Sequence, residues 1–318
     1  MKKIVAACAM AASAACAFGG KGEVAPLKQR RAAKAPAVRV MTYNIRNSAN
    51  DKKTENAWKL RREDFANAVR SENPDVIGFQ EVLPDQRKWL EERFPDYFFS
   101  GEGRNADRVR GESSPVAFRK SRFDLVRTGT FWLSETPDVP GSKGWDAMFP
   151  RVCTYAVLRD KATGGTFSFA NTHTDHRGRV AREKGMLLAI ERMKKFGKGA
   201  PVVFTGDHNC LEYEAPAVAV SKVLKDAMYL SKTTPEGAWR TFNYWHWSGK
   251  ELTIAEALER DVRSRSIPGD DSDMKRIDYI YVSPGTEVLD YRTIPATRPG
   301  MRRYPSDHFP TVATLVFK

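Results

Sequence analysis

Side chains able to bind a metal ion recur in this sequence at points where short apolar segments end or begin. Five such points are spread along the chain: Asn44 after Val40–Tyr43, Glu81 after Val76–Gln80, His173 after Phe167–Thr172, Asp207 and Asn209 after Val202–Gly206, and Asp307 and His308 just before Thr311–Phe317. In α/β proteins the ends of sheet strands are where site residues are presented. The repeated pattern therefore indicates one site to which all five segments contribute.

Each of these positions also has a purely structural interpretation. Asn44 fits a turn or a cap, and Glu81 fits the first turn of a helix, where the helix dipole favours acidic side chains. His173 fits a hydrogen-bonded core histidine. Asp207 fits an Asx turn, and Asp307 could cap the last strand. These alternatives remain open when each position is taken alone.

The segments between these positions alternate between strand and helix patterns. Short apolar, β-branched or aromatic runs predict strands over 38–45, 76–79, 115–118, 123–133, 152–158, 166–171, 202–205, 275–282 and 311–317. Apolar residues at helical spacing predict helices over 60–70, 85–94 and 180–196, and Gly164-Gly165 predicts a hairpin turn. This alternation, with antiparallel pairing in places, is typical of a mixed α/β protein.

Six short blocks resemble the signature blocks of the endonuclease/exonuclease/phosphatase family, in the same order. They are Thr42–Ile45, Gln80-Glu81, Asn171–His173, Gly206–Asn209, Arg276–Tyr279 and Ser306–Pro310. A single block is weakly specific, whereas the ordered set, which extends the resemblance over about residues 40–318, is strongly specific. The family includes pancreatic-type DNases, abasic-site endonucleases, inositol polyphosphate phosphatases, neutral sphingomyelinases and deadenylases.

The resemblance implies a four-layer α/β sandwich of the DNase I type, in which two packed mixed β-sheets are flanked by helices. It also implies a Mg²⁺ or Mn²⁺ ion held mainly by Glu81, with Asn44 and Asp307 in or beside the coordination shell. A hard cation such as Mg²⁺ prefers oxygen ligands and keeps several waters, so one or two carboxylates are enough. We therefore expect a divalent-metal site at these three residues.

The same resemblance implies roles for five further residues in the hydrolysis of a phosphate ester. Asp207 orients and deprotonates the attacking water, and Asn209 holds that water or a phosphate oxygen. His308, supported by Asp278, faces the scissile phosphate together with His173. Charge builds up on the non-bridging phosphate oxygens during hydrolysis, and Mg²⁺, Asn and protonated His can offset it. His308 could instead act as the base, and the sequence leaves that alternative open.

Four positions depart from the family's usual pattern or extend it, and we predict that they contact the substrate. Arg46 stands where pancreatic-type and abasic-site nucleases often carry an acid, and His208 stands where the family usually carries Phe. His176 follows the third block and adds a polar group to the site. Arg151 fits either a phosphate contact or a structural ion pair. It ends the segment 131–151, which resembles an uncharacterised bacterial branch with no established substrate.

The composition fits a globular, exported protein. Hydrophobic residues make up 41% of the 318 residues and aromatic residues 11%, which is enough for a substantial core. A charged start, an Ala-rich apolar run and Ala15-Cys16-Ala17 predict a signal peptide over 1–20. A basic flexible linker over 21–36 and one catalytic domain over 37–318 follow. We expect soluble export, periplasmic or extracellular, rather than lipid attachment at Cys16, with no membrane span in the mature chain.

The net charge is positive but unevenly distributed. It is formally +13, yet seven basic residues and one acidic residue lie in the first 36 positions, which leaves +7 for the rest. A moderate positive field suits a phosphate-bearing partner, including nucleic acid, without requiring one. After the leader the chain keeps Cys153 and Cys210, which could form a disulfide or remain buried thiols.

These observations predict an exported, metal-dependent phosphoesterase that acts as a monomer on a small or single-stranded substrate. The alternatives are a nuclease acting on DNA or RNA and a non-catalytic binding module on the same fold. The aromatic run Trp239–Trp247 could stack nucleobases, face a lipid or sugar, or belong to the core. Because no basic stripe is evident in 46–54 or 260–273, intact duplex DNA is the less favoured substrate.

Overall fold

The computed structural model describes residues 36–246, 251–259, 275–295 and 304–317. The predicted signal peptide, Cys16, nearly all of the predicted linker, and Trp247 lie outside the described residues. Within the described ranges, no helix is both long and apolar enough to cross a membrane.

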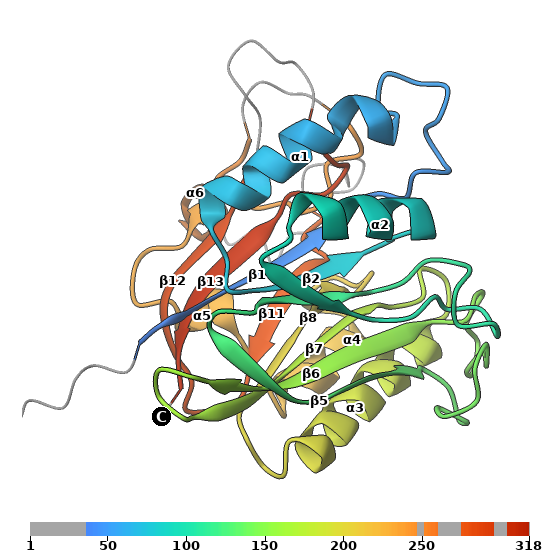
Figure 1. The fold of residues 1–318 in the computed structure, drawn as a ribbon. Coiled ribbons are helices and arrows are strands. Elements are labelled where there is room, and N and C mark those ends of the chain that lie inside the picture. Colours follow the sequence, from blue (N-terminus) through green and yellow to red (C-terminus); the bar gives the residue numbers. More distant parts are fainter. Residues whose placement is uncertain (1–35, 247–250, 260–274, 296–303, 318) are drawn as a thin grey trace, which may run out of the picture. The chain divides into compact units, whose positions relative to one another are not determined.

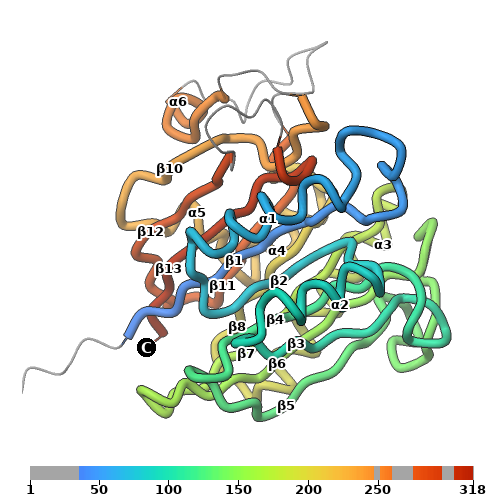
Figure 2. Tube along the Cα trace, turned by 45° about the horizontal axis from the view of Figure 1, so that its top comes forward, coloured from blue at the N-terminus to red at the C-terminus, as the bar shows by residue number. Residues whose placement is uncertain are grey.

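Two mixed sheets form the centre of the domain. The first has the strand order β10-β12-β13-β1-β2-β4-β3, which Figure 2 follows along the Cα trace, and the second has the order β5-β6-β7-β8-β11-β9. The strands of the first sheet are β1 Val38–Asn44, β2 Val76–Gln80, β3 Tyr97–Ser100, β4 Val116–Arg119, β10 Glu236–Gly237, β12 Glu287–Thr293 and β13 Thr311–Val316. Those of the second are β5 Phe123–Trp132, β6 Val152–Asp160, β7 Thr166–His173, β8 Val202–Asp207, β9 Lys225–Asp226 and β11 Asp278–Val282.

Helices cover the outer faces of both sheets. Figure 1 shows α1 (Trp58–Glu72) and α2 (Pro84–Arg93) beside the first sheet, and α3 (Arg179–Phe196) beside the second. Helix α3 buries Met186, Ile190 and Met193 at helical spacing, in one cluster with second-sheet residues. The shorter helices are α4 Ala215–Ser221, α5 Ala227–Leu230 and α6 Ile254–Glu259. The four-layer sandwich predicted from the sequence is therefore confirmed.

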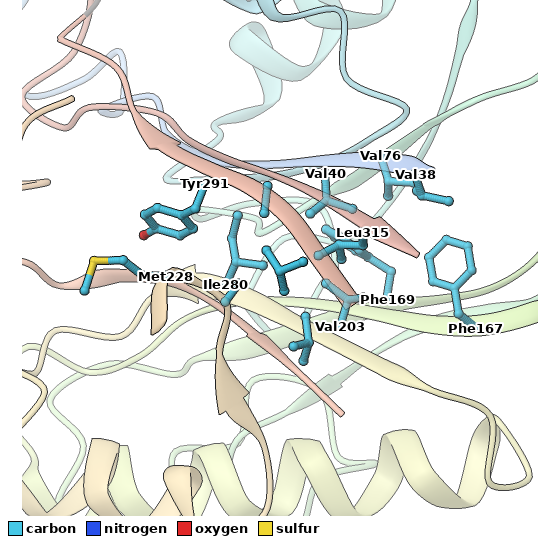
Figure 3. Close-up of a cluster of buried hydrophobic side chains, with 14 of the residues drawn as sticks. Val38, Val40, Val76, Phe167, Phe169, Val203, Met228, Ile280, Tyr291 and Leu315 are labelled. Carbon is cyan, nitrogen blue, oxygen red and sulfur yellow. The ribbon is translucent and has the colours of Figure 1, made fainter. Parts of the chain in front are cut away.

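The main core lies between the two sheets. Figure 3 shows Val40, Val76 and Leu315 of the first sheet facing Phe169 and Val203 of the second. All five side chains are fully buried. Burying an aliphatic or phenyl side chain of this size contributes about 1.5–3 kcal/mol, so this interface holds the sheets together. The apolar, β-branched strand segments of the sequence form this interface. Such segments are apolar throughout because the strands are covered on both faces.

The strand directions bring the predicted site residues to one edge of the sandwich. Strands β1 and β2 are parallel, as are β7 and β8, so their carboxyl ends lie together in each sheet. Strand β11 is antiparallel to β8, and the register places Asp278 opposite Asp207, with His173 beside Asp207 on the other side. Asn44 lies beside Gln80 in the first sheet. A side-chain bond from Asn44 Nδ2 to Asp207 Oδ2, 2.9 Å long, joins the two sheets at this edge.

A buried polar layer lies between the sheets just behind that edge. Asn171 Nδ2 donates to the backbone oxygen of Phe79 at 2.7 Å, and Gln80 Nε2 donates to Asn171 Oδ1 at 2.6 Å. Gly78 is required here, because a Cβ at this position would lie 2.6 Å from Thr205 Oγ1. Gln80 and Asn171, which belong to the signature blocks, therefore fix the distance between the sheets.

The element predictions agree with the structure for the long segments and miss several short ones. The hairpin at Gly164-Gly165 joins β6 to antiparallel β7, and Gly164 has a φ of 73°. The predicted strand over 275–282 begins only at Asp278. Strands β3, β9, β10 and β12 and helices α4, α5 and α6 were not predicted. Cys153 and Cys210 are both buried free thiols, so no disulfide joins them.

Candidate active site

A pocket of about 610 Å³ opens at the edge where the strand ends meet. Nine of the twelve predicted site residues line it: Arg46, Glu81, Arg151, His173, His176, Asp207, Asn209, Asp307 and His308. Asn44 and Asp278 are not among the lining residues, but they bond to Asp207 and His308 respectively. Only His208 lies elsewhere. The strand-end pattern of the sequence thus corresponds to a single cavity.

Glu81 is held in place by backbone and side-chain donors. It follows β2 with a φ of 61°, a left-handed conformation that is unusual for a residue with a side chain. Its Oε2 accepts hydrogen bonds from Asn47 N at 3.0 Å and Asn47 Nδ2 at 2.9 Å, and its Oε1 accepts one from Asn44 Nδ2 at 3.1 Å. Burial opposes ionisation, but Arg46 and the Asn47 amide outweigh it and lower the pKa of Glu81. The carboxylate is therefore charged and fixed in orientation.

Asp307 completes an oxygen-rich corner beside Glu81. Its carboxylate lies 3.4 Å from Arg46 Nη1 and accepts a hydrogen bond from Ser306 Oγ at 3.3 Å. Burial raises the pKa of Asp307, and the neighbouring charge of Glu81 raises it further against the effect of His308. Two buried carboxylates that interact in this way repel each other unless positive charge lies between them.

The possible metal-ligand atoms in this part of the pocket suit a hard divalent cation. Ligand atoms of Glu81, His173 and Asp207 all lie within 4.8 Å of one another, and Asp307 lines the same pocket. Carboxylate oxygens predominate, as Mg²⁺ and Mn²⁺ prefer. Asn44 turns its amide nitrogen toward Glu81 and Asp207, while its oxygen accepts from Arg46 N at 3.0 Å. In this geometry Asn44 lies beside the carboxylates as a donor that orients them.

Asp207 and Asp278 lie at the two different ring nitrogens of His308. Asp278 Oδ2 lies 2.8 Å from His308 Nδ1, and His308 Nε2 lies 3.6 Å from Asp207 Oδ2. Burial opposes the charged imidazole, but the carboxylates of Asp278 and Asp207 outweigh it and raise the pKa of His308 to about 10. Burial raises the pKa of Asp207 to about 7, against the effect of His308. At neutral pH the histidine is the charged partner, and Asp207 is the group poised to take a proton.

His173 and Asn209 flank the Asp207 carboxylate. His173 Nε2 lies 3.4 Å from Asp207 Oδ2, and His173 Nδ1 is buried without a hydrogen-bond partner. Burial and the charge of Arg151 hold the pKa of His173 well below its usual value, so its ring is neutral. Asn209, with a φ of 46°, donates from its backbone N to Asp207 Oδ1 at 3.0 Å, and its side chain bonds to Thr174 O at 3.1 Å.

The prediction that His208 contacts the substrate is wrong. Its side chain is fully buried and stacks against Phe204, Tyr279 and Tyr281, with ring centroids 4.8, 5.8 and 5.6 Å away. Side chains alternate between the two faces where β8 ends, so His208 points away from the pocket that Asp207 lines. Burial lowers the pKa of His208 to about 3, and the ring is a neutral core group.

The structure places the other predicted contacts on the pocket wall. Arg46 pairs with Asp51 at 2.9 Å as well as with Asp307. Arg151 is almost fully buried, with its Nε 3.4 Å from Asp175 Oδ2 and its Nη2 3.2 Å from His176 Nδ1. The ion-pair alternative for Arg151 is therefore present in the structure, although the residue also lines the pocket.

Several wall residues were not among the predicted site residues. They are Asn47, Arg104, Glu112, Phe149, Phe242 and Lys275. Phe242 belongs to the aromatic run and packs its ring 4.6 Å from that of His308, whereas Trp239 is buried in the core. The others lie in irregular loops, where neither spacing nor residue type marks a site.

A two-sheet sandwich with an acid- and histidine-lined pocket at the strand ends defines a DNase I-like protein. The model of the Endonuclease/Exonuclease/phosphatase family matches residues 41–308, and the chain belongs to this family. Enzymes of the family hydrolyse phosphoester bonds and typically depend on a divalent metal.

Solved structures of similar proteins support this assignment. An endonuclease/exonuclease/phosphatase family protein from Bacteroides thetaiotaomicron is 34% identical, with a TM-score of 0.78 over 90% of this chain and 96% of that chain. A mannosyl-6-phosphatase from the same organism is 35% identical, with a TM-score of 0.75 over 88% of this chain and 100% of that chain. TDP2 of D. rerio, solved with a single-strand DNA product, is 17% identical with a TM-score of 0.65, over 88% of this chain and 99% of that chain, and shares the fold.

Curated relatives match over shorter stretches. An uncharacterized protein of Acanthamoeba polyphaga mimivirus is 28% identical over 160 residues, which is 48% of this chain and 59% of that protein. A second mimivirus protein is 24% identical over 204 residues, or 53% of this chain and 30% of that protein. The match therefore spans less than two thirds of the length of either relative.

Proposed function

We propose that this protein is a divalent-metal-dependent phosphoesterase that hydrolyses a small phosphate monoester. The observation that carries the proposal is the convergence of Glu81, Asp207 and His308 on one pocket. A non-catalytic binding module would have no need of a fixed carboxylate, a proton acceptor and a charged histidine at this spacing. Mg²⁺ or Mn²⁺ is the expected cofactor, held by Glu81 and Asp307.

The side chains divide the reaction between them. A bound Mg²⁺ or Mn²⁺ would supply positive charge to the phosphoryl oxygens. Asp207 orients the attacking water and takes its proton, because its raised pKa suits a base at neutral pH. Charged His308, fixed through Asp278, and the Asn209 amide offset charge on the phosphoryl group. The ester P–O bond then breaks, the alkoxide takes a proton from a solvent water, and the hydroxide so formed takes the proton from Asp207, which restores the carboxylate.

Two observations favour a small substrate. The mannosyl-6-phosphatase from Bacteroides thetaiotaomicron is 35% identical to this chain, and the match covers 100% of that protein's chain and 88% of this one. Three arginines at the pocket, Arg46, Arg104 and Arg151, each face a carboxylate, so they add little net positive field for a polyanion. Both observations support a compact phosphate monoester over a nucleic acid strand.

The test is a hydrolysis panel with Mg²⁺ or Mn²⁺ at matched phosphate concentration and moderate salt. The substrates are hexose 6-phosphates, phenyl phosphate, a bis-aryl phosphodiester, single-stranded oligonucleotides and supercoiled plasmid. We expect the monoesters to be hydrolysed fastest and a chelator to abolish the activity. Full activity in excess chelator, or plasmid nicking that outpaces every other substrate and resists raised salt, would contradict the proposal.

We also propose that the protein is exported. The supporting features are the charged start, the Ala-rich apolar run and the Ala15-Cys16-Ala17 site of the sequence. Sequencing of the amino terminus after expression in a bacterial host should give a chain that starts within a few residues after Ala17. A chain that keeps Met1 in the cytoplasmic fraction would exclude export by this signal.

A further inference from the structure

Three planar side chains form one wall of the pocket, on loops outside the signature blocks. We call Arg104, Phe149 and His176 the stacked wall. The guanidinium of Arg104 lies 5.1 Å from the centroid of the Phe149 ring, and the Phe149 and His176 rings lie 6.0 Å apart with an interplanar angle of 20°. All three line the pocket, and Phe149 is 38% exposed. None of them takes part in the mechanism above.

The stacked wall is anchored rather than loose. The Asp175 carboxylate accepts hydrogen bonds from Phe149 N at 3.2 Å and Arg151 Nε at 3.4 Å with Oδ2, and from Gly178 N at 2.8 Å with Oδ1. It thus joins the loop before β6 to the loop after β7. Asp146 of the same loop accepts from Ala181 N at 2.7 Å at the start of α3. The geometry of the wall is therefore set before any ligand binds, which lowers the entropy cost of recognition.

Arg151 fixes which nitrogen of His176 carries the proton. Its Nη2 lies 3.2 Å from His176 Nδ1, and a guanidinium can only donate. Nδ1 is therefore the acceptor, and the proton of the neutral ring lies on Nε2. Because the His176 ring is exposed in the pocket wall, Nε2–H is a donor that a ligand can reach. A hydrogen bond at one ring nitrogen of a histidine commonly fixes which nitrogen carries the proton.

Arg104 of the wall and Arg151 beside it are each paired with an acid. Arg104 Nη1 lies 2.6 Å from Glu112 Oε2, and Arg151 pairs with Asp175. Glu112 is in turn bonded by Asn47 Nδ2 at 3.1 Å. The wall consequently offers N–H donors and a flat carbon surface without an excess of positive charge. Such a surface suits neutral acceptor oxygens, whereas a second phosphate group requires uncompensated cations.

We propose that the stacked wall binds the sugar ring of a sugar phosphate and so selects the leaving group. The C–H face of the ring packs against the flat surface, and a hydroxyl oxygen accepts the His176 Nε2 proton. This inference rests on the proposed phosphoesterase function and adds the substrate class.

The test compares two substrates on matched variants. His176→Phe keeps the planar ring but removes the donor, and Phe149→Leu removes the flat surface. Phe98→Leu is the control, because Phe98 is also 38% exposed and does not line the pocket. We expect each wall variant to raise KM for a hexose 6-phosphate about three- to tenfold, with little change in kcat; for His176→Phe this is the loss typical of one neutral hydrogen bond. Phenyl phosphate, which has no hydroxyl groups, should show less than about a twofold change with His176→Phe.

The outcomes separate this inference from the proposed function. An equal loss on both substrates in His176→Phe would show that the residue acts on the phosphate, and unchanged KM in both wall variants would overturn the sugar subsite. Faster hydrolysis of nucleoside 5′-phosphates than of hexose phosphates would assign the wall to a base. If the protein hydrolyses neither monoester, the function fails, and saturation-transfer NMR with free hexose still decides the wall. A signal with the natural protein that His176→Phe weakens supports the subsite; no signal, or an unchanged one, rejects it.

Discussion

Asp207 is the residue on which the proposed chemistry depends most directly. Its carboxylate lies within 3.6 Å of both His173 and His308, and it accepts hydrogen bonds from Asn44 and the Asn209 backbone. Asp207→Asn keeps the shape and removes the proton acceptor. We expect kcat to fall by roughly 10²–10⁴ with the fold retained, as measured by steady-state kinetics and circular dichroism.

The neighbours of Asp207 provide graded controls. His308→Ala should lower kcat by as much as Asp207→Asn, because the charged group opposite the phosphate is lost. Asp278→Asn should cost less, because it only supports His308. Near-normal turnover in Asp207→Asn would transfer the role of base to His308, despite its raised pKa.

His208 permits a test in the opposite direction. Both of its ring nitrogens are buried without hydrogen-bond partners, and an unpaired buried polar group costs about 1–3 kcal/mol. His208→Phe removes that cost and keeps the aromatic stack. We expect unchanged activity and an unchanged or slightly higher free energy of unfolding, measured by denaturant titration. His308→Phe, the same change at a pocket histidine, should abolish turnover, whereas a severe activity loss in His208→Phe would place His208 in the reaction.

The contrast between these histidines shows what the sequence can reveal at single positions. The ordered blocks located Glu81 and Asp207, which stand where parallel strands end, and His308, which stands just before the antiparallel strand β13. The blocks could not reveal to which face of its strand each side chain points. His208 is adjacent to Asp207 in sequence, yet successive side chains of a strand point to opposite faces. Asn47, which orients Glu81, lies in a loop where no periodicity exists.

At the scale of elements, the contact between the two sheets sets the geometry of the site. Gly78 of β2 faces Asn171 of β7 and Thr205 of β8, with no room for a Cβ. We expect Gly78→Ala to lower the free energy of unfolding by about 1–3 kcal/mol and to lower kcat, since the sheets must separate at the site edge. Denaturant titration and kinetics measure the two effects.

Gly165→Ala is the matched control for this change. Gly165 lies in the β6–β7 hairpin, where a Cβ would meet only the Thr163 hydroxyl at 3.2 Å. Its stability should change little. Equal stability of the two variants would show that the sheets can move apart at Gly78 without cost, and that the polar layer does not fix their spacing.

The elements that the sequence failed to predict share a physical cause. Strands β9 and β10 are two residues long, too short to show any alternation. Strand β12, Glu287–Thr293, carries a bulge after Val288 that interrupts its period of two. By contrast α1, α3 and the central strands are long and buried, so their apolar spacing is fixed by the core. The central strands hold most of the site, which is why most of the site could be predicted as well.

At the scale of the whole molecule, the site gathers buried carboxylates that repel one another, and a metal ion would offset that repulsion. Glu81, Asp207 and Asp307 are buried along one pocket, and burial raises the pKa of the last two. Nearby cations are shared with other acids, as Arg46 is with Asp51. The formal charge of +7 outside the first 36 residues does not relieve a local cluster of negative groups that is shielded from water.

Binding of Mg²⁺ or Mn²⁺ should therefore stabilise the folded protein. A ligand at about 100 times its Kd that binds only the folded state adds about 2.7 kcal/mol, which for a domain of this size raises Tm by roughly 5 °C. We expect this increase in a thermal scan of the natural protein and its reversal by a chelator. Glu81→Gln removes the main ligand charge but keeps the hydrogen-bonding shape, so its Tm should no longer respond to the metal. Glu63→Gln changes an exposed ion pair between Glu63 of α1 and Arg93 of α2, neither of which lines the pocket. Its Tm should respond to the metal as that of the natural protein does. A metal-induced increase of the same size in Glu81→Gln would show that the ion binds without Glu81, and the metal site assigned to this corner would then be wrong.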